Sequence, residues 1–544
     1  MSFGLSRTLE VLAASENLAA NDLLVEIVFH GEPEQASSAL EFVLAKRYPE
    51  ALFRLVAGYH LLSEASRKKL LTIGNRLSNS IRRAYLDVSE TIYANGCDLI
   101  RQLPDFDQAP LLLGSFSKDT TRKQDAEQIL FHLILELLRQ MELPSNERPY
   151  HDIEGARQRM LATLRDAMRR YTLYHSEVIP EGFLLLADED APEVPRILRE
   201  GRDLCHRPMV IIFRRRNHPR ILRWIFPLLN NRHPPGVILA LISERDDDPF
   251  IHHLLDNIGQ LAEPFIANAF RKITEVRWLR PDHRIWHNLS ESRKTNAVIL
   301  LTQSGLPIER KLEVLAFFLD EGEPSARRAA ACALAQLPGA DANNMVRACM
   351  DDDDPEVQLA ATQQIRERGI TNALAMLLKK LDHSDARIRE AAHEALSDYT
   401  MERYIGVFEQ LDDSTRKTMG SMILKIDKQS RQALLAQLHS QQRRLQMRAA
   451  RIVRALGIGD DYVSELLVLL ADKDHLVRRE MIETLAHLQD PTFVQRLVEM
   501  TSSQEAQTQH GAYEAIDRLR RAASAPAVRD ALHVAAANLG MTSI

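Results

Sequence analysis

Aromatic residues and cysteines are scarce in this sequence. Phe, Trp and Tyr together account for 6% of the 544 residues, and Gly and Pro are modest in number. No segment has a convincing β-strand pattern, whereas Ala, Leu, Arg and Glu are abundant, which favours helices. The cysteines lie far apart without a Cys-x-x-Cys pair, so the simplest interpretation is reduced, buried thiols in a cytoplasmic protein. These cysteines are Cys97, Cys205, Cys332 and Cys349.

Long hydrophobic runs are also missing. The longest, such as residues 129–138, are too short to cross a bilayer and include His132 and Glu136. The N-terminus lacks a basic stretch followed by a long apolar one. We therefore expect neither a signal peptide nor a membrane-spanning segment.

No common catalytic or nucleotide-binding motif is present. The sequence contains no Walker loop, no Gly-x-Gly-x-x-Gly, no Gly-x-Ser-x-Gly and no His-Glu-x-x-His. Its 45% apolar and 26% charged residues are typical of a folded protein, and a net charge of -6 indicates little about partners. We expect a non-catalytic protein without a cofactor or a bound metal.

A repeat of roughly 30 residues occupies the C-terminal part of the sequence. In each copy an apolar residue ends one helix, acidic or small polar residues and often Pro follow, and a second helix begins. The clearest copies start at Leu319, Met350, Leu381, Leu411 and Leu470, with looser copies between the last two and after Met500. Seven units in register indicate a structural repeat.

Simple chemistry predicts the helix boundaries in these copies. Asp or Ser before the second helix can accept hydrogen bonds from free N–H groups, and Pro suits the first helical turn. Within the second helix, apolar residues recur on one face, with alanines where helices approach closely. This predicted buried stripe comprises Val357, Ala360, Ala361 and Ile365, then Ile388, Ala391, Ala392 and Leu396, then Val477, Met481 and Leu485.

The run of four aspartates at 351–354 belongs to this pattern. A calcium loop needs ligands at alternating positions, a Gly in the middle and a Glu at its end, and this segment lacks that arrangement. We therefore predict that the aspartates form an inter-helix turn.

The pattern resembles the HEAT-repeat family, in particular the short bacterial repeats also called phycobilisome-lyase HEAT-like repeats. The resemblance spans about 319–520 and rests on the acidic turn, Pro355, the apolar residues Val357, Ile388 and Val477, the arginines Arg389 and Arg478, and the run "AAHEAL". It implies an all-α fold, a right-handed solenoid of antiparallel helix pairs whose second helices line a concave face. It also implies ladder contacts between turn acids and Arg327, Arg389 and Arg478.

The same succession of turn, proline and helix recurs upstream, at Pro192, Pro219 and Pro249. We therefore extend the solenoid toward the N-terminus, with a connection at 143–156. The predicted regions are a helical N-terminal region at 1–150, atypical Arg-rich HEAT-like repeats at 151–318, regular repeats at 319–521 and a capping segment at 522–544. The sequence leaves open whether 1–150 consists of degenerate repeats.

The first functional hypothesis is a scaffold that binds a protein or peptide partner in the concave groove. Second-helix positions that point away from the buried stripe carry both signs of charge, which suits a protein better than a polyanion. The candidate partner-binding residues are Arg328, Gln363, Arg366, Glu390, Glu394, Arg479 and Glu483.

Nucleic-acid binding is the alternative hypothesis. Residues 196–232 contain ten arginines and two acids, and the adjacent 155–175 adds five arginines. Clustered arginines can contact phosphates. The candidate residues are Arg214, Arg215, Arg216, Arg220 and Arg223.

A structural role explains the same arginines nearly as well. Aligning Pro219 with Pro355 places Ile221 and Trp224 on buried positions of the repeat. It also places residues 214–216 in an inter-helix turn, where they could pair with the acids of 188–193.

Enzymes of HEAT-like fold form a third class. Deoxyhypusine hydroxylase uses several His-Glu dyads, but only His393–Glu394 is present here, and one pair cannot hold two metals. Chromophore lyases share the repeat, which alone is weak evidence. An alkylpurine DNA glycosylase would need a cleft with residues such as Trp278, Trp286 and Asp282, and we expect the tryptophans to lie in the core instead.

Overall fold

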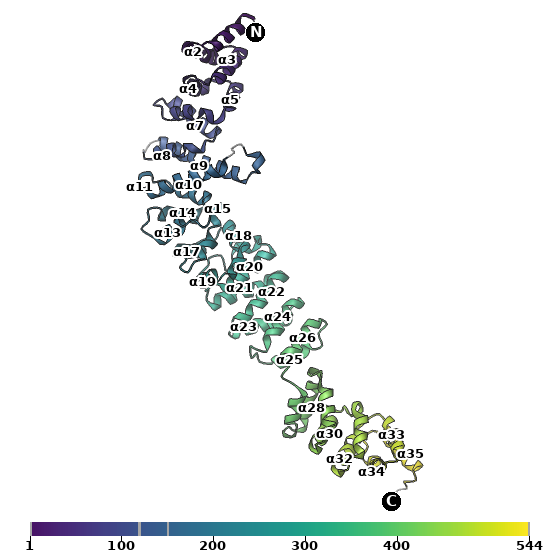
Figure 1. Ribbon diagram of the computed structural model, residues 1–544. Coiled ribbons are helices and arrows are strands. Elements are labelled where there is room, and N and C mark those ends of the chain that lie inside the picture. The colour runs from purple at the N-terminus through teal and green to yellow at the C-terminus, as the bar shows by residue number, and fades with distance from the viewer. Residues whose placement is uncertain (1–2, 118–120, 149–151, 542–544) are drawn as a thin grey trace. The chain divides into compact units, whose positions relative to one another are not determined.

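The computed structural model describes residues 3–117, 121–148 and 152–541, and every regular element in these ranges is a helix (Figure 1). The predicted all-α class is confirmed. Residues 149–151 of the predicted connection and 542–544 of the predicted cap lie outside the described residues. No helix in the described ranges is long and apolar enough to cross a membrane. The chain forms two compact units, Met1–Arg310 and Lys311–Ile544.

The C-terminal unit consists of helix pairs, each with a first helix, a short turn and a second helix. The first helices are α21 (Ile308–Glu321), α23 (Ala340–Cys349), α25 (Ala373–Lys380), α27 (Met401–Val407), α29 (Ser430–Leu438), α31 (Val463–Val468) and α33 (Thr492–Met500). The second helices are α22 (Pro324–Ala333), α24 (Pro355–Ile365), α26 (Ala386–Ala395), α28 (Asp413–Ile426), α30 (Arg443–Leu456), α32 (His475–Leu485) and α34 (Ala506–Ala522). A final helix, α35 (Pro526–Asn538), packs against α33 and α34.

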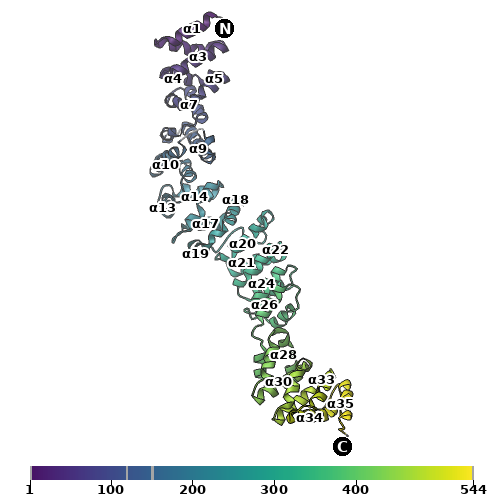
Figure 2. The same cartoon turned by 45° about the vertical axis from the view of Figure 1, so that its right-hand side comes forward.

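Each predicted copy of the repeat supplies one of these second helices. They pack side by side, α22 on α24 on α26, and α28 on α30 on α32 on α34 (Figure 1 and Figure 2). A short 3₁₀ segment, η10 (Leu469–Ala471), continues α31 and packs against α32 and α34. The predicted α-solenoid of stacked helix pairs is therefore confirmed.

Acidic turn residues begin several second helices, as predicted. The side chains of Asp354, Asp385, Asp412 and Asp474 accept backbone N–H groups of their helices at 2.9, 2.8, 3.0 and 2.9 Å, respectively. Pro324 and Pro355 occupy the first turns of α22 and α24. The aspartate run is confirmed as an inter-helix turn, because α24 begins directly after it.

The predicted stripe forms the core of the C-terminal unit. All eleven of its residues are at most 7% exposed. Alanines such as Ala361 and Ala392 let neighbouring second helices approach closely, and the larger apolar residues fill the space between them. Cys332 departs from the prediction of four buried thiols: Cys97, Cys205 and Cys349 are buried, but Cys332 lies exposed on α22, away from the stripe.

The predicted ladder between turn acids and arginines is only partly confirmed. Arg327 pairs with Asp352 of the next repeat through two hydrogen bonds of 3.0 and 3.1 Å. Arg389 instead donates to the carbonyls of its own turn, and Arg478 does the same while pairing with Glu514 on α34. These arginines satisfy carbonyl groups left free where the first helix ends.

Asp354 should make the stability of the C-terminal unit sensitive to acid. Burial alone would raise the pKa of this carboxyl, but hydrogen bonds from Arg328 at 2.7 Å and from the Glu356 N–H outweigh it and hold the pKa below 3.8. A carboxyl with a lowered pKa contributes stability above its unfolded-state pKa and loses it as the pH falls through the folded-state value.

We expect Asp354→Asn to destabilise the protein by about 1 kcal/mol at pH 7, since Asn keeps the cap but loses the charge. Urea unfolding at several pH values checks this. The difference from wild type should be constant above pH ~5 and shrink below pH ~4. Asp353→Asn, at an exposed neighbour, is the control; a difference for Asp354→Asn that persists unchanged in acid would contradict the assignment.

The N-terminal unit is also built from helices that pack in chain order. Its helices are α1 (Phe3–Ala14), α2 (Leu18–His30), α3 (Pro33–Lys46), α4 (Pro49–Ala57), α5 (Glu64–Leu71), α6 (Ser78–Tyr85), α7 (Glu90–Gln102), α8 (Ala109–Gly114), α9 (Thr121–Glu142), α10 (Ile153–Arg169), α11 (Tyr171–Tyr174), α12 (Val178–Leu186), α13 (Glu193–Arg199), α14 (His206–Arg215), α15 (Pro219–Leu222), α16 (Ile225–Leu229), α17 (Gly236–Glu244), α18 (Asp248–Asp256), α19 (Pro264–Phe270) and α20 (Glu291–Gln303). Helices α4, α7, α9 and α12 succeed one another in the packing.

Prolines lie at the beginning of the upstream helices, as the sequence predicted. Pro219 begins α15 and Pro249 lies in the first turn of α18, while Pro192 directly precedes α13. The helix expected after Pro219 is divided into α15 and α16. Pro227 explains the break, because it cannot donate to the carbonyl of Arg223 and its ring clashes with that group.

Candidate functional site

The seven predicted partner-binding residues lie on or at the end of the second helices, away from the core. Six of them are exposed, and Glu483 is half-buried. Arg328, Gln363, Glu390 and Glu394 belong to α22, α24 and α26, Arg366 follows the last residue of α24, and Arg479 and Glu483 belong to α32. The predicted orientation of these side chains is confirmed.

Two of these arginines connect neighbouring repeats. Arg328 on α22 pairs with Asp354 at the start of α24. Arg366 pairs with Asp398 and donates to the hydroxyl of Ser397 at 3.2 Å, both of which follow α26. Their side chains remain 48% and 44% exposed, respectively, so a partner can still reach them.

Three other candidates have no polar partner in the described part of the chain. No hydrogen bond or ion pair joins the side chains of Gln363, Glu390 and Glu394 to another described residue. Their polar groups are solvated and free to bind a ligand.

A hollow of about 330 Å³ lies on the second-helix face between α32 and α34. Two predicted residues, Arg479 and Glu483, line it together with Ile482 of the same helix. Arg518 and Ala522 of α34 form the opposite wall. The hollow therefore combines two guanidinium groups, one carboxylate and a small apolar surface.

An ion-pair network holds the polar wall of this hollow in place. Glu483 accepts from Arg479 at 3.0 Å and pairs with Arg454 on α30 at 3.2 Å. The buried Glu480 pairs with the same Arg454 and with Arg451, at 3.0 and 2.9 Å. Because α30 anchors Glu483, the side chain of Arg479 is oriented before any partner arrives.

The arginines of the alternative hypothesis lie in the N-terminal unit, and most are paired. Arg214 pairs with Glu244 at 3.0 Å, and Arg216 makes two bonds to the buried Glu181, at 2.8 and 2.9 Å. Arg220 lies 3.9 Å from Glu142, and Arg223 lies 3.6 Å from Glu189. Arg215 is the one member of the five without an ion pair among the described residues.

Two details of the prediction for this cluster are corrected. Arg214 and Arg215 form the last turn of α14, and only Arg216 lies in the turn that follows. The acid partner of Arg214 is Glu244 at the end of α17, and that of Arg216 is Glu181 on α12, and both of these helices pack against α14. Within 188–193, Glu189 lies near Arg223, whereas Asp188 pairs with Arg157 and Glu193 pairs with Arg165, both on α10.

The core role predicted for the aromatic and apolar residues beside the arginines is confirmed. Ile221 and Trp224 are fully buried, and the indole N–H of Trp224 donates to the carbonyl of Leu184 at 3.0 Å. The indole is therefore not available to stack on a base.

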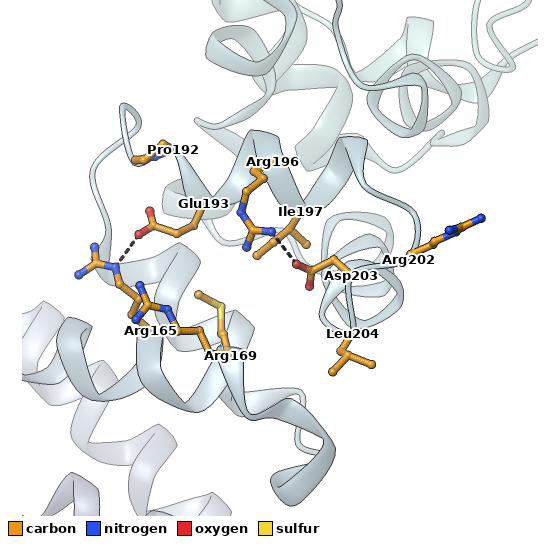
Figure 3. Close-up of a pocket in the computed structure, with 10 residues that line it drawn as sticks. Arg165, Arg169, Pro192, Glu193, Arg196, Ile197, Arg202, Asp203 and Leu204 are labelled. Atoms are coloured by element: carbon orange, nitrogen blue, oxygen red, sulfur yellow. Dashed lines mark hydrogen bonds and ion pairs between the residues drawn. The ribbon is translucent and has the colours of Figure 1, made fainter.

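A larger pocket of about 570 Å³ lies in the N-terminal unit, where the two arginine-rich stretches meet (Figure 3). Arg165 and Arg169 on α10 face Glu193 and Arg196 on α13, with the loop from Arg202 to Leu204 at the rim. Arg165 donates to Glu193 at 2.5 Å, and Arg196 pairs with Asp203 at 3.0 Å. Sequence reasoning noticed both stretches but missed this constellation, because only the packing of α10 near α13 brings them together.

The residues of the enzyme alternatives have structural contacts. His393 lies 3.0 Å from the carbonyl of Ile426 through Nδ1. Trp278 and Trp286 are buried and pack with ring centroids 5.8 Å apart, while Asp282 is exposed. Across the described residues, no group of three or more His, Cys, Asp or Glu side chains is arranged to hold a metal ion.

Comparison with known proteins identifies the repeat. The HEAT-repeat family matches residues 312–397, 343–419, 431–517 and 463–539. These matches lie within the C-terminal half of the chain and agree with the resemblance seen in the sequence.

Several solved structures are similar over most of the chain. Kap95p with RanGDP has 9% identity and a TM-score of 0.27, over 99% of this chain and 80% of that chain. Importin beta has 13% identity and a TM-score of 0.20, over 95% and 82%, and an engineered protein has 14% and 0.19, over 92% and 98%. A search of curated proteins found no match.

Proposed function

We propose that this chain is a non-catalytic scaffold that binds a protein or peptide partner along the exposed face of the second helices in its C-terminal unit. The observation that carries the proposal is the hollow between α32 and α34, lined by Arg479, Glu483 and Arg518. Opposite charges beside a small apolar surface suit the mixed polar and apolar side chains of a peptide. A preformed helical face also loses little conformational entropy on binding.

We further propose that the repeats are of the short bacterial type found in phycobilisome lyases. Their second helices begin at intervals of roughly 30 residues, and several start with an acidic turn. We place the protein in the cytoplasm, a setting that suits its four free cysteines.

Charge reversal in the hollow tests the partner-binding proposal. We expect Arg479→Glu/Arg518→Glu to reduce the amount of partner captured from a nuclease-treated lysate at least tenfold, because like charges would face the ligand's carboxylates. Quantitative mass spectrometry of captured proteins measures the effect. Arg347→Glu/Arg496→Glu is the matched control, since it makes the same charge change at exposed positions of first helices.

The outcomes separate the hypotheses. If both double variants lost the same proteins, the second-helix face would not be the binding site. The same conclusion would follow if neither variant lost any protein. Binding through nucleic acid would instead be abolished by nuclease and weakened by replacing Arg214, Arg215 and Arg216, with a steep dependence on salt.

A further inference from the structure

The stack of second helices in the C-terminal unit is interrupted between α26 and α28. Helix α26 packs against α24, and α28 packs against α30, but within the described part of this unit α26 and α28 do not pack against each other in the same way. The segment 397–400 joins α26 to α27 at this point (Figure 1). It divides the unit into a first block, α21–α26, and a second block, α27–α35.

The hydrophobic core is divided at the same position. Buried apolar side chains from Met401 to Ala536 form one cluster in the second block. The buried stripe of the first block, which ends at Leu396, contributes no side chain to this cluster among the described residues. Helices that share a close-packed core move together, so the break separates two bodies that are each internally packed.

The second block holds α28 tightly. The hydroxyl of Tyr404 on α27 donates to the carbonyl of Arg416 at 2.7 Å, and Asp427, directly after α28, accepts from the N–H of Met401 at 2.8 Å. Gly420 on α28 lies so close to Tyr404 that an added Cβ atom would meet its hydroxyl oxygen at 2.7 Å. Helix α28 therefore belongs with α27 and not with α26.

The connecting segment has no apolar anchor. Other connections between repeats of this unit contain a buried apolar residue, such as Ile370 after α24 and Leu488 after α32. None of the residues 397–400 is buried, and Tyr399 is 37% exposed. Rotating the backbone of this segment would therefore expose little additional apolar surface.

Exposed ion pairs tie the segment to both blocks. Asp398 pairs with Arg366 of the first block and, at 3.4 Å, with Arg403 of the second. The side chains of Arg366, Asp398 and Arg403 are 44%, 53% and 70% exposed, respectively. Ion pairs this exposed contribute at most about 1 kcal/mol each, so they guide the segment without fixing it.

One hydrogen bond joins α26 directly to α28. The ring Nδ1 of the half-buried His393 lies 3.0 Å from the carbonyl oxygen of Ile426, the last residue of α28. A carbonyl oxygen only accepts, so Nδ1 carries the hydrogen. Carbonyl groups at the end of a helix lack a partner within it, which leaves this one free for His393. No other hydrogen bond or ion pair joins the described residues of these two helices.

We propose that residues 397–400 form a hinge about which the second block moves relative to the first, and that the hydrogen bond from His393 to Ile426 is the latch of this hinge. Changes in the backbone angles of a few connecting residues are enough for such a motion, because neither core has to open. The motion changes how α26 and α28 present the second-helix face, so one chain fits partners of different shape.

The hinge does not rest on the proposed function. It is a property of the chain without a partner, and it is measured in the absence of one. Loss of partner capture with Arg479→Glu/Arg518→Glu leaves this prediction unchanged, and a rigid connection at 397–400 leaves the proposed binding face unchanged.

Distances between nitroxide labels, measured by double electron–electron resonance on the full-length protein, test the hinge. Cys332 on α22 is exposed and the other cysteines are buried, so Ser421→Cys on α28 adds a second label on the far side of the hinge. The matched control is Cys332→Ser/Ser421→Cys/His510→Cys, whose labels on α28 and α34 are also three second helices apart in chain order but lie within the second block. We expect the distance distribution across the hinge to be at least about twofold wider than that of the control.

Replacing His393 by alanine tests the latch, with His487→Ala as the matched control. The Nδ1 of His487, which follows α32, lies 2.9 Å from the carbonyl of Glu483 in the same repeat. We expect His393→Ala to widen the distribution across the hinge further and to leave the label pair within the second block unchanged, whereas His487→Ala changes neither. His393→Asn, whose amide places a donor close to the position of Nδ1, should keep the wild-type width.

Equal widths for the two label pairs would overturn the hinge. An unchanged width across the hinge with His393→Ala would overturn the latch, because the bond would then hold nothing. Widening of both pairs would also overturn it, because the substitution would then have loosened the second block itself.

Discussion

Replacing Arg245 by methionine is expected to destabilise the N-terminal unit by about 1.5–3 kcal/mol, because it removes a buried guanidinium that donates to a half-buried carboxylate and to backbone carbonyls. The side chain of Arg245 is only 5% exposed and follows the last residue of α17. It donates to the carboxylate of Asp247 through two bonds of 2.8 Å. It also reaches the end of α14, where it donates to the carbonyls of Phe213 and Arg216.

Removing the guanidinium group of Arg245 would therefore affect three helices, α14, α17 and α18. Methionine fills much of the same volume but leaves the carbonyl of Phe213 without its donor and Asp247 without its counter-charge. Burial raises the pKa of Asp247, but the hydrogen bonds and charge of Arg245 more than offset this and keep the pKa below its ordinary value. Without Arg245, the same burial would penalise the ionised carboxylate.

Urea unfolding and hydrogen exchange across α14, α17 and α18 measure this effect. Arg215→Met is the matched control, because Arg215 lies in the last turn of α14, is exposed and has no ion pair among the described residues; we expect a change within about 0.5 kcal/mol. Similar unfolding for the two variants would show that Arg245 does not hold these helices together.

Replacing Gly511 by alanine is expected to destabilise the C-terminal unit by about 1–3 kcal/mol, as overpacking commonly does. Gly511 lies on α34 where this helix crosses η10. A Cβ atom at this position would lie 2.0 Å from the carbonyl oxygen of Leu470 and 2.9 Å from its carbon. Both atoms belong to the backbone, so relief requires α34 to move away from η10.

Gly406→Ala provides the control for Gly511→Ala. Gly406 is also a helical glycine, on α27, but an added Cβ would meet nothing within 4 Å. Alanine should there be neutral or stabilising by about 0.5–1 kcal/mol, because it reduces the freedom of the unfolded chain. Thermal unfolding followed by circular dichroism compares the variants, and equal midpoints would contradict the close approach at Gly511.

Much of the C-terminal unit could be predicted because residues close together in the sequence determine where each helix of the repeat begins and which face it buries. Asp354 and Pro355 mark where α24 begins, and Val357 with Ala361 mark the face that it buries, without any knowledge of distant residues. The same signals recur in the other copies, so each copy supports the others. Pro227 is a local signal that the prediction did not use. It explains why the helix expected after Pro219 is divided into α15 and α16.

The polar contacts could not be predicted in the same way. Arg389 and Arg478 were both predicted to pair with turn acids, yet their guanidinium groups donate to turn carbonyls. Which acceptor an arginine binds depends on how far its side chain reaches in the folded chain and not on sequence spacing. The arginine pocket depends on the packing of α10 near α13, which no periodicity encodes. The hollow beside Arg479 also depends on Arg518, which only the packing of α34 against α32 brings to the opposite wall.

Site-specific photo-crosslinking tests most directly whether a partner binds the second helices. A photoreactive amino acid replaces Gln363 on α24 or Arg518 on α34, and Val468, 71% exposed on the first helix α31, is the control position. We expect protein adducts at positions 363 and 518 that persist after nuclease treatment, and few at 468. Adducts at 468 alone, or adducts that disappear with nuclease, would contradict it.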